Sequence, residues 1–285
     1  MRNTLGVGAL VLAACSGEPP GFATPESALH DPVADVYLVS NIDGAPLAKD
    51  GKGSIARVDP DGSLQRYWIA SGTNGVTLHA PKGLALVDDV LWVADIDVLR
   101  RFDRSSGAPL GEVAIPGATF LNDVSAGPAG AVYCTDSGLD AQFQPTGTDA
   151  IWRVGKDGAV TALIRGPELG QPNGLVARDG GVYVVSWRDG SFYQVDYRGV
   201  RTDLGKAPSA QLDGLVRVEA KQAGEAAAWY ATSWAGQGIV RFDVTGGCTA
   251  LPLRLEQPAD CGWDATRRRL LVPLFGANRL ELVPL

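Results

Sequence analysis

Short apolar segments recur along the chain, and turn residues separate them. Six of these segments span residues 36–40, 90–94, 131–135, 182–186, 228–232 and 269–274. Several of the segments that follow them end on an aspartate, as Ile55–Asp59 and Ile239–Asp243 do, and glycine-containing turns come next. Short strands separated by Gly, Asp and Pro are typical of all-β proteins. We find no long apolar run of helical period outside the N-terminus, so the pattern predicts an all-β fold.

A polar residue stands about ten residues before each of these strands, and we call it the head of its unit. The heads are Glu26, Lys82, Asn122, Asn173, Asp213 and Asp260, at steps of 56, 40, 51, 40 and 47 residues. A period of this length is typical of a four-stranded propeller blade. The sequence therefore predicts a six-bladed β-propeller with four-stranded blades over residues 24–285. The uneven steps predict loop insertions at 43–53, 137–149 and 219–227.

Residues 1–15 have the features of a lipoprotein signal peptide. One positive charge at Arg2 precedes a short apolar run that is too short to span a bilayer. The run ends in Leu12–Cys15, which resembles a bacterial lipobox with Cys15 as the lipidated residue, and 16–23 follow as a flexible tether. We expect a lipid-anchored protein of the bacterial cell envelope, at the periplasmic face of the outer membrane if the cell is Gram-negative. An ordinary signal peptide with a chance cysteine is the alternative.

Charge and cysteine content narrow the class of protein further. The 285 residues carry a formal net charge of −7 without a basic patch, which argues against a nucleic-acid partner. A closed array of this length can form one domain, and we expect a monomer. Export places the chain in an oxidising compartment. Besides Cys15, three cysteines remain, and this odd number leaves at least one free. We expect Cys134 to lie in the core and Cys248 not to pair with Cys261.

The heads also predict a cation site. Glu26, Asn173 and Asp213 occupy equivalent positions of a closed repeat, so their oxygens would meet on its axis. Such oxygens suit a hard divalent cation, although each residue could also be a turn residue that bonds its own backbone. The chain has two histidines, neither near a recognisable carboxylate partner, and no G-x-S-x-G or H-E-x-x-H motif. This scarcity favours metal-assisted chemistry with a carboxylate handling the proton.

Two other heads and several residues near the heads remain to be interpreted. Asp260 could face the channel or belong to a turn, and Lys82 could bring a positive charge to the channel mouth. We expect Asp123 to accept hydrogen bonds from buried backbone amides. Trp187 and Trp234 each follow a serine at matching positions, where they either line a pocket or pack between blades.

Four motifs, in order, resemble those of the SMP-30/gluconolactonase family. They are Pro25–Pro32, Leu121–Val124, Gln171–Leu175 and Leu212–Leu215, and the resemblance extends over about residues 24–285. The family fold is a six-bladed propeller. Its members bind one divalent cation in the central channel, and many of them hydrolyse sugar lactones.

The resemblance implies roles for particular residues. Glu26, Asn173 and Asp213 would be the metal ligands, and Asp213 would also handle the proton. Asn122 would lie beside the metal and contact the substrate. Phe120 would be a substrate-binding position too, but family lactonases often have an arginine there that holds substrate oxygens.

Two function classes follow. In the first, the protein is a surface-tethered, metal-dependent hydrolase of a lactone or related ester. In the second, it is a non-catalytic propeller lipoprotein that binds a ligand or partner, and the ion is structural. Calcium is the first candidate for the ion, with magnesium, manganese or zinc as alternatives. The first motif departs from the family pattern at Ser27 and His30, and the substitution of arginine by Phe120 indicates a less polar substrate or no substrate.

Overall fold

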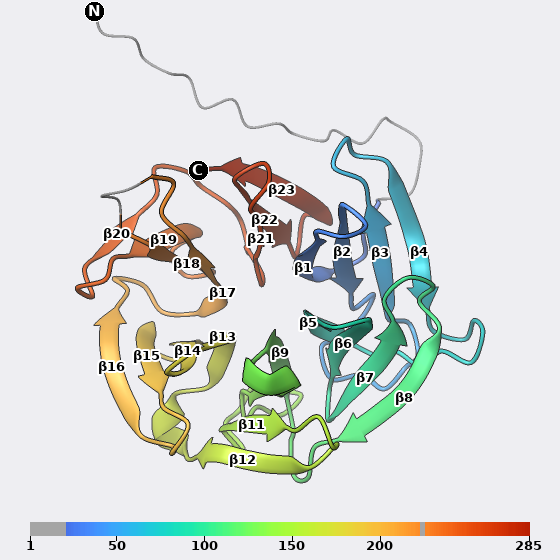
Figure 1. The fold of residues 1–285 in the computed structure, drawn as a ribbon, viewed down its shortest axis with the longest axis horizontal. Coiled ribbons are helices and arrows are strands. Elements are labelled where there is room, and N and C mark those ends of the chain that lie inside the picture. The colour runs from blue at the N-terminus through green and yellow to red at the C-terminus, as the bar shows by residue number, and fades with distance from the viewer. Residues whose placement is uncertain (1–20, 223–225) are drawn as a thin grey trace, which may run out of the picture.

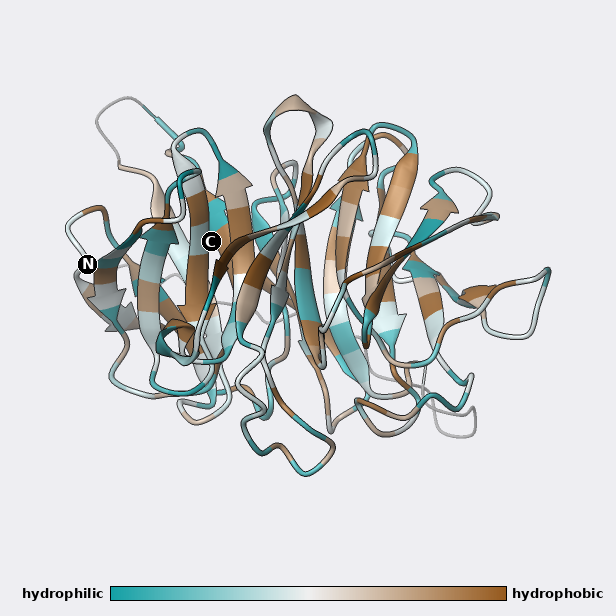
Figure 2. Cartoon of the chain, turned by 90° about the horizontal axis from the view of Figure 1, so that it is seen from below, coloured by the Kyte–Doolittle hydropathy of each residue, from teal (hydrophilic) through white to brown (hydrophobic). Residues whose placement is uncertain are grey.

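The chain forms a six-bladed β-propeller, as predicted. The computed structural model describes residues 21–222 and 226–285, in which six antiparallel sheets surround a central channel (Figure 1). Hydrophobic segments are concentrated in the strands, whereas the loops at the two faces are mostly hydrophilic (Figure 2). Residues 1–20, including Cys15 and most of the predicted tether, lie outside the described residues.

The strands of each blade are consecutive in the chain and run from the channel outward. Blades 1 to 3 consist of β1 (Pro25–Asp31), β2 (Val36–Asn41), β3 (Ser54–Val58), β4 (Leu64–Ala70); β5 (Pro81–Val87), β6 (Val90–Asp95), β7 (Val98–Asp103), β8 (Pro109–Ala114); β9 (Leu121–Ala126), β10 (Val132–Asp136), β11 (Ala150–Val154) and β12 (Val160–Arg165). Blades 4 to 6 consist of β13 (Pro172–Arg178), β14 (Gly181–Ser186), β15 (Ser191–Val195), β16 (Arg201–Lys206); β17 (Leu212–Val218), β18 (Ala228–Ser233), β19 (Gly238–Phe242), β20 (Cys248–Ala250); β21 (Gly262–Asp264), β22 (Arg269–Leu274) and β23 (Arg279–Pro284).

The sixth blade has three strands in the described residues, and side-chain packing joins it to blade 1. A buried apolar cluster spans the two blades and includes Tyr37 and Leu271. The amide of Asp260 donates to the carbonyl of Glu26 (2.8 Å), and the hydroxyl of Tyr37 donates to Asp264 (2.6 Å). The ring therefore closes by hydrophobic burial and by polar contacts between the first and the last blade.

The predicted insertions coincide with loops. Residues 43–53 lie between β2 and β3, and residues 137–149 lie between β10 and β11. The third, 219–227, lies between β17 and β18 and includes residues outside the described part. The first two loops reach the end of the channel where the heads lie.

An irregular register at the start of the innermost strands turns the heads toward the channel. In β13, Pro172 pairs with Ser186 but Leu175 pairs with Val184, and β1, β5, β9 and β17 show the same shift. A bulge of this kind re-aims one side chain out of the regular alternation. The head residues thus line the channel because the strand pairing is interrupted at their position.

The sixth head is Ala259, and the prediction of Asp260 is wrong by one residue. The hydroxyl of Thr135 donates to the carbonyl of the head Asn173 (2.8 Å), and the equivalent hydroxyl of Thr232 donates to the carbonyl of Ala259 (2.9 Å). Because side chains alternate along a strand, a shift of one residue changes what a side chain faces. Asp260 consequently takes the position after the head, as Asp123 does in blade 3.

The glycines after two heads have a packing role. Gly174 and Gly214 do not adopt a left-handed φ. A Cβ on Gly174 would clash with the backbone of Asp213, and one on Gly214 would clash with the backbone of Cys261. The Asn-Gly and Asp-Gly pairs therefore allow neighbouring innermost strands to approach closely.

Candidate functional site

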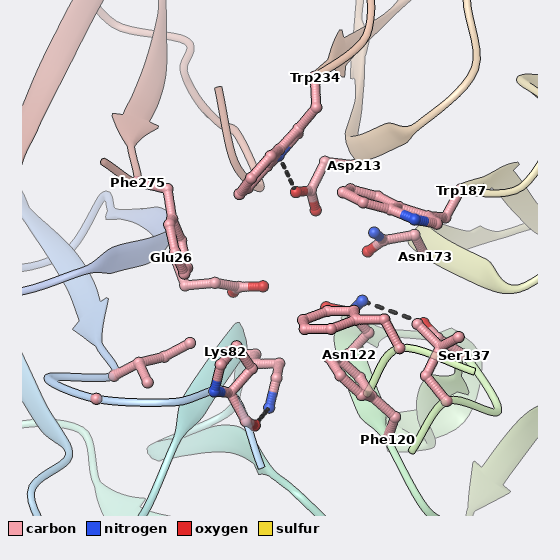
Figure 3. A pocket seen from close by; sticks show the side chains of 15 residues that line it. Glu26, Lys82, Phe120, Asn122, Ser137, Asn173, Trp187, Asp213, Trp234 and Phe275 are labelled. Atoms are coloured by element: carbon pink, nitrogen blue, oxygen red, sulfur yellow. Dashed lines mark hydrogen bonds between the residues drawn. The ribbon is translucent and has the colours of Figure 1, made fainter. Parts of the chain in front are cut away.

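A cavity of about 270 Å³ opens at the end of the channel where the innermost strands begin. Five heads line it: Glu26, Lys82, Asn122, Asn173 and Asp213. They come from β1, β5, β9, β13 and β17, so the closed ring gathers residues that are far apart in the chain (Figure 3).

The three predicted cation ligands lie in this one cavity. Glu26, Asn173 and Asp213 point toward a common space (Figure 3). One oxygen of each is buried without a hydrogen-bond partner, namely Glu26 Oε2, Asn173 Oδ1 and Asp213 Oδ1. A buried polar atom without a partner costs about 1–3 kcal/mol. Three such oxygens in one cavity are the pattern that an oxygen-liganded cation would satisfy.

The donor set contains two carboxylates and one amide. Within residues 21–222 and 226–285, no three His, Cys, Asp or Glu side chains are close enough to share a metal ion. A cation at this site would thus use the amide oxygen of Asn173 as its third protein ligand. Carboxylate and amide oxygens suit calcium or magnesium better than metals that prefer sulfur or imidazole.

Four buried acids, Glu26, Asp123, Asp213 and Asp260, influence one another's protonation along the channel. Burial, together with the charges of Asp213 and Asp260, raises the pKa of Glu26 well above its ordinary value. Burial and the charge of Asp260 likewise raise the pKa of Asp213 and of Asp123. The ionised acids oppose one another in a desolvated space, so a bound cation would favour their charged forms.

Lys82 places one cation beside these acids. Its side chain is 1% exposed, and burial lowers its pKa although the charge of Glu26 opposes this. The ammonium donates to the carbonyl of Pro46 (2.9 Å) and to that of Ala80 (3.1 Å). It also lies 4.7 Å from the ring centroid of Phe120. Lys82 therefore holds the 43–53 loop against the cavity and partly balances Glu26.

Hydrogen bonds orient two further heads. The indole Nε1 of Trp234 donates to Asp213 Oδ2 (2.6 Å), which leaves Oδ1 as the partnerless oxygen. The amide of Asn122 donates to the hydroxyl of Ser137 (3.1 Å), which in turn donates to the carbonyl of Pro172 (2.8 Å). Asp213 and Asn122 are thereby held by residues that also line the cavity.

Phe120 lines the cavity, but its ring is mostly covered. It is 4% exposed and packs between Lys82 and Phe143, whose ring centroid lies 6.0 Å away. Phe143 belongs to the 137–149 loop and is half exposed. The position where family lactonases often have an arginine is therefore apolar here.

A row of aromatic residues at the mouth was not predicted as a unit. Trp187, Trp234 and Phe275 each follow the second strand of their blade, in blades 4, 5 and 6, and all three line the cavity. Their rings lie edge to face or tilted, with centroids 5.4 Å apart for Trp187 and Trp234 and 5.2 Å apart for Trp234 and Phe275. We call these three residues the aromatic wall. The repeated Ser-Trp pairs were the only sequence signal for it.

Asp260 and Asp123, which directly follow heads, accept hydrogen bonds within the protein. This structural role was expected for Asp123. Its carboxylate accepts from the amides of Val124 (2.6 Å) and Leu175 (2.8 Å). Asp260 accepts from the hydroxyl of Ser27 (2.5 Å).

In the described chain Cys134, Cys248 and Cys261 are free, and Cys134 is buried in the core.

Neither histidine lines the cavity. His30 borders the hollow at the opposite end of the channel and lies 3.2 Å from Asp35. His79 accepts a hydrogen bond from the amide of Gly51 (3.1 Å).

Comparison with solved structures identifies proteins of the same fold. A gluconolactonase from Xanthomonas campestris is similar with a TM-score of 0.71 at 17% identity, over 93% of this chain and 87% of that one. A putative gluconolactonase is similar with a TM-score of 0.70 at 20% identity, over 99% and 93%. The chain has the six-bladed propeller fold of these gluconolactonases. No protein-family model and no curated protein matches its sequence.

A second group shares the fold but carries a different activity. Virginiamycin B lyase from Staphylococcus aureus is similar with a TM-score of 0.62 at 15% identity, over 98% of this chain and 99% of that one. That structure is of a catalytically inactive variant in which alanine replaces a histidine. The fold alone therefore does not separate hydrolysis from elimination.

Proposed function

We propose that this protein is a divalent-cation-dependent hydrolase of lactones or related esters. The observation that carries the proposal is the set of three partnerless buried oxygens, on Glu26, Asn173 and Asp213, in one cavity. The likeness in fold to a gluconolactonase is compatible with this reaction class.

Glu26, Asn173 and Asp213 would hold the cation, with calcium as the first candidate and magnesium, manganese or zinc as alternatives. When bound, the cation would supply Lewis-acid polarisation of the substrate carbonyl. It would also neutralise acids whose mutual repulsion Lys82 relieves only in part.

Asp213 is the proposed proton carrier. Water adds to the lactone carbonyl and gives one proton to Asp213. The bond between the carbonyl carbon and the ring oxygen then breaks, and the proton passes to that oxygen, so the product is a hydroxy acid. Trp234 fixes one oxygen of Asp213 by a hydrogen bond, which keeps the other directed at the cavity. Asn122 is held beside it by Ser137 and would contact the substrate.

The positions of the histidines argue against lyase chemistry of the virginiamycin type. A histidine-to-alanine variant of that lyase is described as catalytically inactive. Here His30 and His79 both lie away from the residues that line the cavity. Among the described residues that line the cavity, the groups that can exchange a proton near neutral pH are the carboxylates and Lys82, whose pKa burial lowers to about 8.

A non-catalytic binding protein with a structural ion is the second candidate. The apolar lining of the cavity favours it, since Phe120 stands where family lactonases often have an arginine. In that case Glu26, Asn173 and Asp213 would join blades 1, 4 and 5 through the ion without turning over a ligand.

We further propose that Cys15 anchors the protein in the bacterial cell envelope through a lipid, as a monomer. The support is the Leu-Ala-Ala-Cys sequence at residues 12–15. Among the described residues, no helix is long and apolar enough to cross a membrane.

Hydrolysis by the purified full chain tests the proposal. Lactones and esters are offered with calcium, with magnesium, and after chelation, and acid release is followed. We expect cation-dependent turnover that Asp213→Asn lowers by about 10²- to 10⁴-fold in kcat, with a smaller change in KM. Asp203→Asn, an exposed acid on the outermost strand β16, is the matched control and should keep wild-type rates. Wild-type kcat in Asp213→Asn would remove Asp213 from the mechanism. If no compound is hydrolysed, the binding-protein candidate replaces the hydrolase.

A further inference from the structure

The two sides of the cavity mouth are apolar. On one side stands the aromatic wall, which blades 4, 5 and 6 contribute in order (Figure 3). On the other side lies Phe120 (Figure 3), against which Phe143 of the 137–149 loop packs, and Leu139 of the same loop also lines the cavity. Glu26, Asn173 and Asp213 lie between these sides (Figure 3). A bound molecule would therefore meet oxygens at one end and aromatic or aliphatic carbon around the rest.

Several polar groups around this space already bond protein partners, whereas Glu26, Asn173 and Asp213 each keep one partnerless oxygen. Two donors of Lys82 bond the carbonyls of Pro46 and Ala80, and its charge lies against the ring of Phe120. The hydroxyl of Ser137 both accepts and donates within the protein. The indole N–H of Trp234 is bonded to Asp213. No arginine is among the described residues that line the cavity.

A sugar lactone would fit this environment poorly. Its ring carries several hydroxyl groups, and each one loses its hydrogen bonds to water on entry. A site selects a hydroxylated ligand when its own polar groups await those hydroxyls, and rejects it when the hydroxyls find no partner. An apolar substituent, in contrast, gains about fourfold in binding for each methylene group that it buries.

We propose that the substrate of this site is a lactone or ester that carries an aryl or alkyl substituent and few free hydroxyl groups. The inference rests on the proposed hydrolase activity and names its substrate class. The carbonyl lies toward the oxygens of Glu26, Asn173 and Asp213. The substituent packs against the aromatic wall, where stacked or edge-to-face contacts with a ring are favourable.

The test compares kcat/KM of the cation-loaded full chain for four lactones that differ only in substituents. They are δ-valerolactone, δ-decalactone, a phenyl-substituted δ-valerolactone and glucono-δ-lactone. We expect the decalactone and the phenyl compound to exceed glucono-δ-lactone by about 10²-fold or more, since three buried methylenes alone are worth about 60-fold. A phenyl-substituted δ-lactam, which resists hydrolysis, serves as a binding probe by calorimetry.

Variants of the wall connect the preference to this site. Trp187→Ser and Phe275→Ser remove one ring each and should lower the decalactone-to-valerolactone ratio of kcat/KM by about tenfold, in the range for lost apolar contacts in a pocket. Tyr67→Ser is the matched control, because Tyr67 is an exposed aromatic residue on the outermost strand β4. It should leave the ratio unchanged.

The outcomes separate the inference from the proposed function. Hydrolysis of glucono-δ-lactone at least as fast as of the decalactone would overturn the apolar preference and leave the hydrolase standing. If no lactone is hydrolysed but the phenyl lactam binds, and Trp187→Ser weakens that binding, the apolar specificity stands and the hydrolase falls. Absence of both turnover and lactam binding would overturn both.

Discussion

Removal of divalent cations is expected to lower the melting temperature of this protein. Glu26 and Asp213 would then share a buried space without a counter-ion other than Lys82, and three buried oxygens would keep no partner. At about 1–3 kcal/mol for each such atom, the structure sets an upper bound of several kcal/mol on what a cation can restore. A ligand present at 100 times its Kd stabilises the folded state by about 2.7 kcal/mol. For a domain of this size we expect a shift of about 5–10 °C.

The measurement is thermal unfolding of the chelated full chain, followed by circular dichroism, with calcium, magnesium, manganese or zinc added stepwise. Wild type should gain melting temperature as the cation concentration rises. Glu26→Gln should lose this dependence, and without cations it should be at least as stable as wild type, because it removes a buried acid. Glu112→Gln makes the same chemical change on the exposed outer strand β8 and should behave as wild type.

Two results would refute this reasoning. One is a wild-type melting temperature that does not change up to about 10 mM of each cation, a concentration above the Kd range of weak extracellular calcium sites. The other is a cation response of the same size in Glu26→Gln and in wild type, which would place the cation elsewhere in the protein.

Three more predictions follow from single contacts. Phe120→Arg would place a guanidinium beside the ammonium of Lys82, which now lies 4.7 Å from the ring of Phe120, so this variant should destabilise the protein. Adding Lys82→Gln should relieve the charge repulsion and raise kcat/KM for glucono-δ-lactone. Additive effects on stability in the double-mutant cycle would contradict a contact between positions 82 and 120. Burial raises the pKa of Asp31, but hydrogen bonds from Arg104 and from the amides of Ala34 and Val33 together more than offset it and leave the pKa below its ordinary value. Arg104→Gln should therefore cost about 2 kcal/mol at pH 7. The deficit in urea unfolding should shrink as the pH falls below about 4, where Asp31 of the unfolded chain becomes protonated, and should vanish below the lower pKa of the folded state. A deficit at pH 3 as large as that at pH 7 would argue against the ion pair. Cys15→Ser should release the protein from membranes on cell fractionation, and acylated Cys15→Ser protein in the membrane fraction would exclude Cys15 as the anchor.

The sequence was sufficient for the architecture because each blade is built from consecutive segments. The strand 182–186 pairs with its neighbours in the chain through short turns, so local apolar runs and glycine turns predict it. The same locality placed Glu26, Asn173 and Asp213 at one position of the repeat, and closure of the ring then brings them into one cavity. Whether they bind a cation stays a prediction.

Only the tertiary structure decided the features that depend on contacts between blades. Ala259 rather than Asp260 is the sixth head, because the hydroxyl of Thr232 in blade 5 bonds its carbonyl. The ammonium of Lys82 donates to the carbonyl of Pro46 in a separate loop and to that of Ala80 just before its own strand. The sequence could not show that this ammonium group already has hydrogen-bond partners.

The aromatic wall illustrates the same division. Two Ser-Trp pairs were visible in the sequence, but Phe275 follows a leucine and carried no such signal. The three rings meet because the residue after the second strand faces the channel mouth in successive blades. Sequence periodicity thus determines which residues occupy equivalent positions, whereas the polarity of the cavity depends on which partners from other blades satisfy or leave open each buried group.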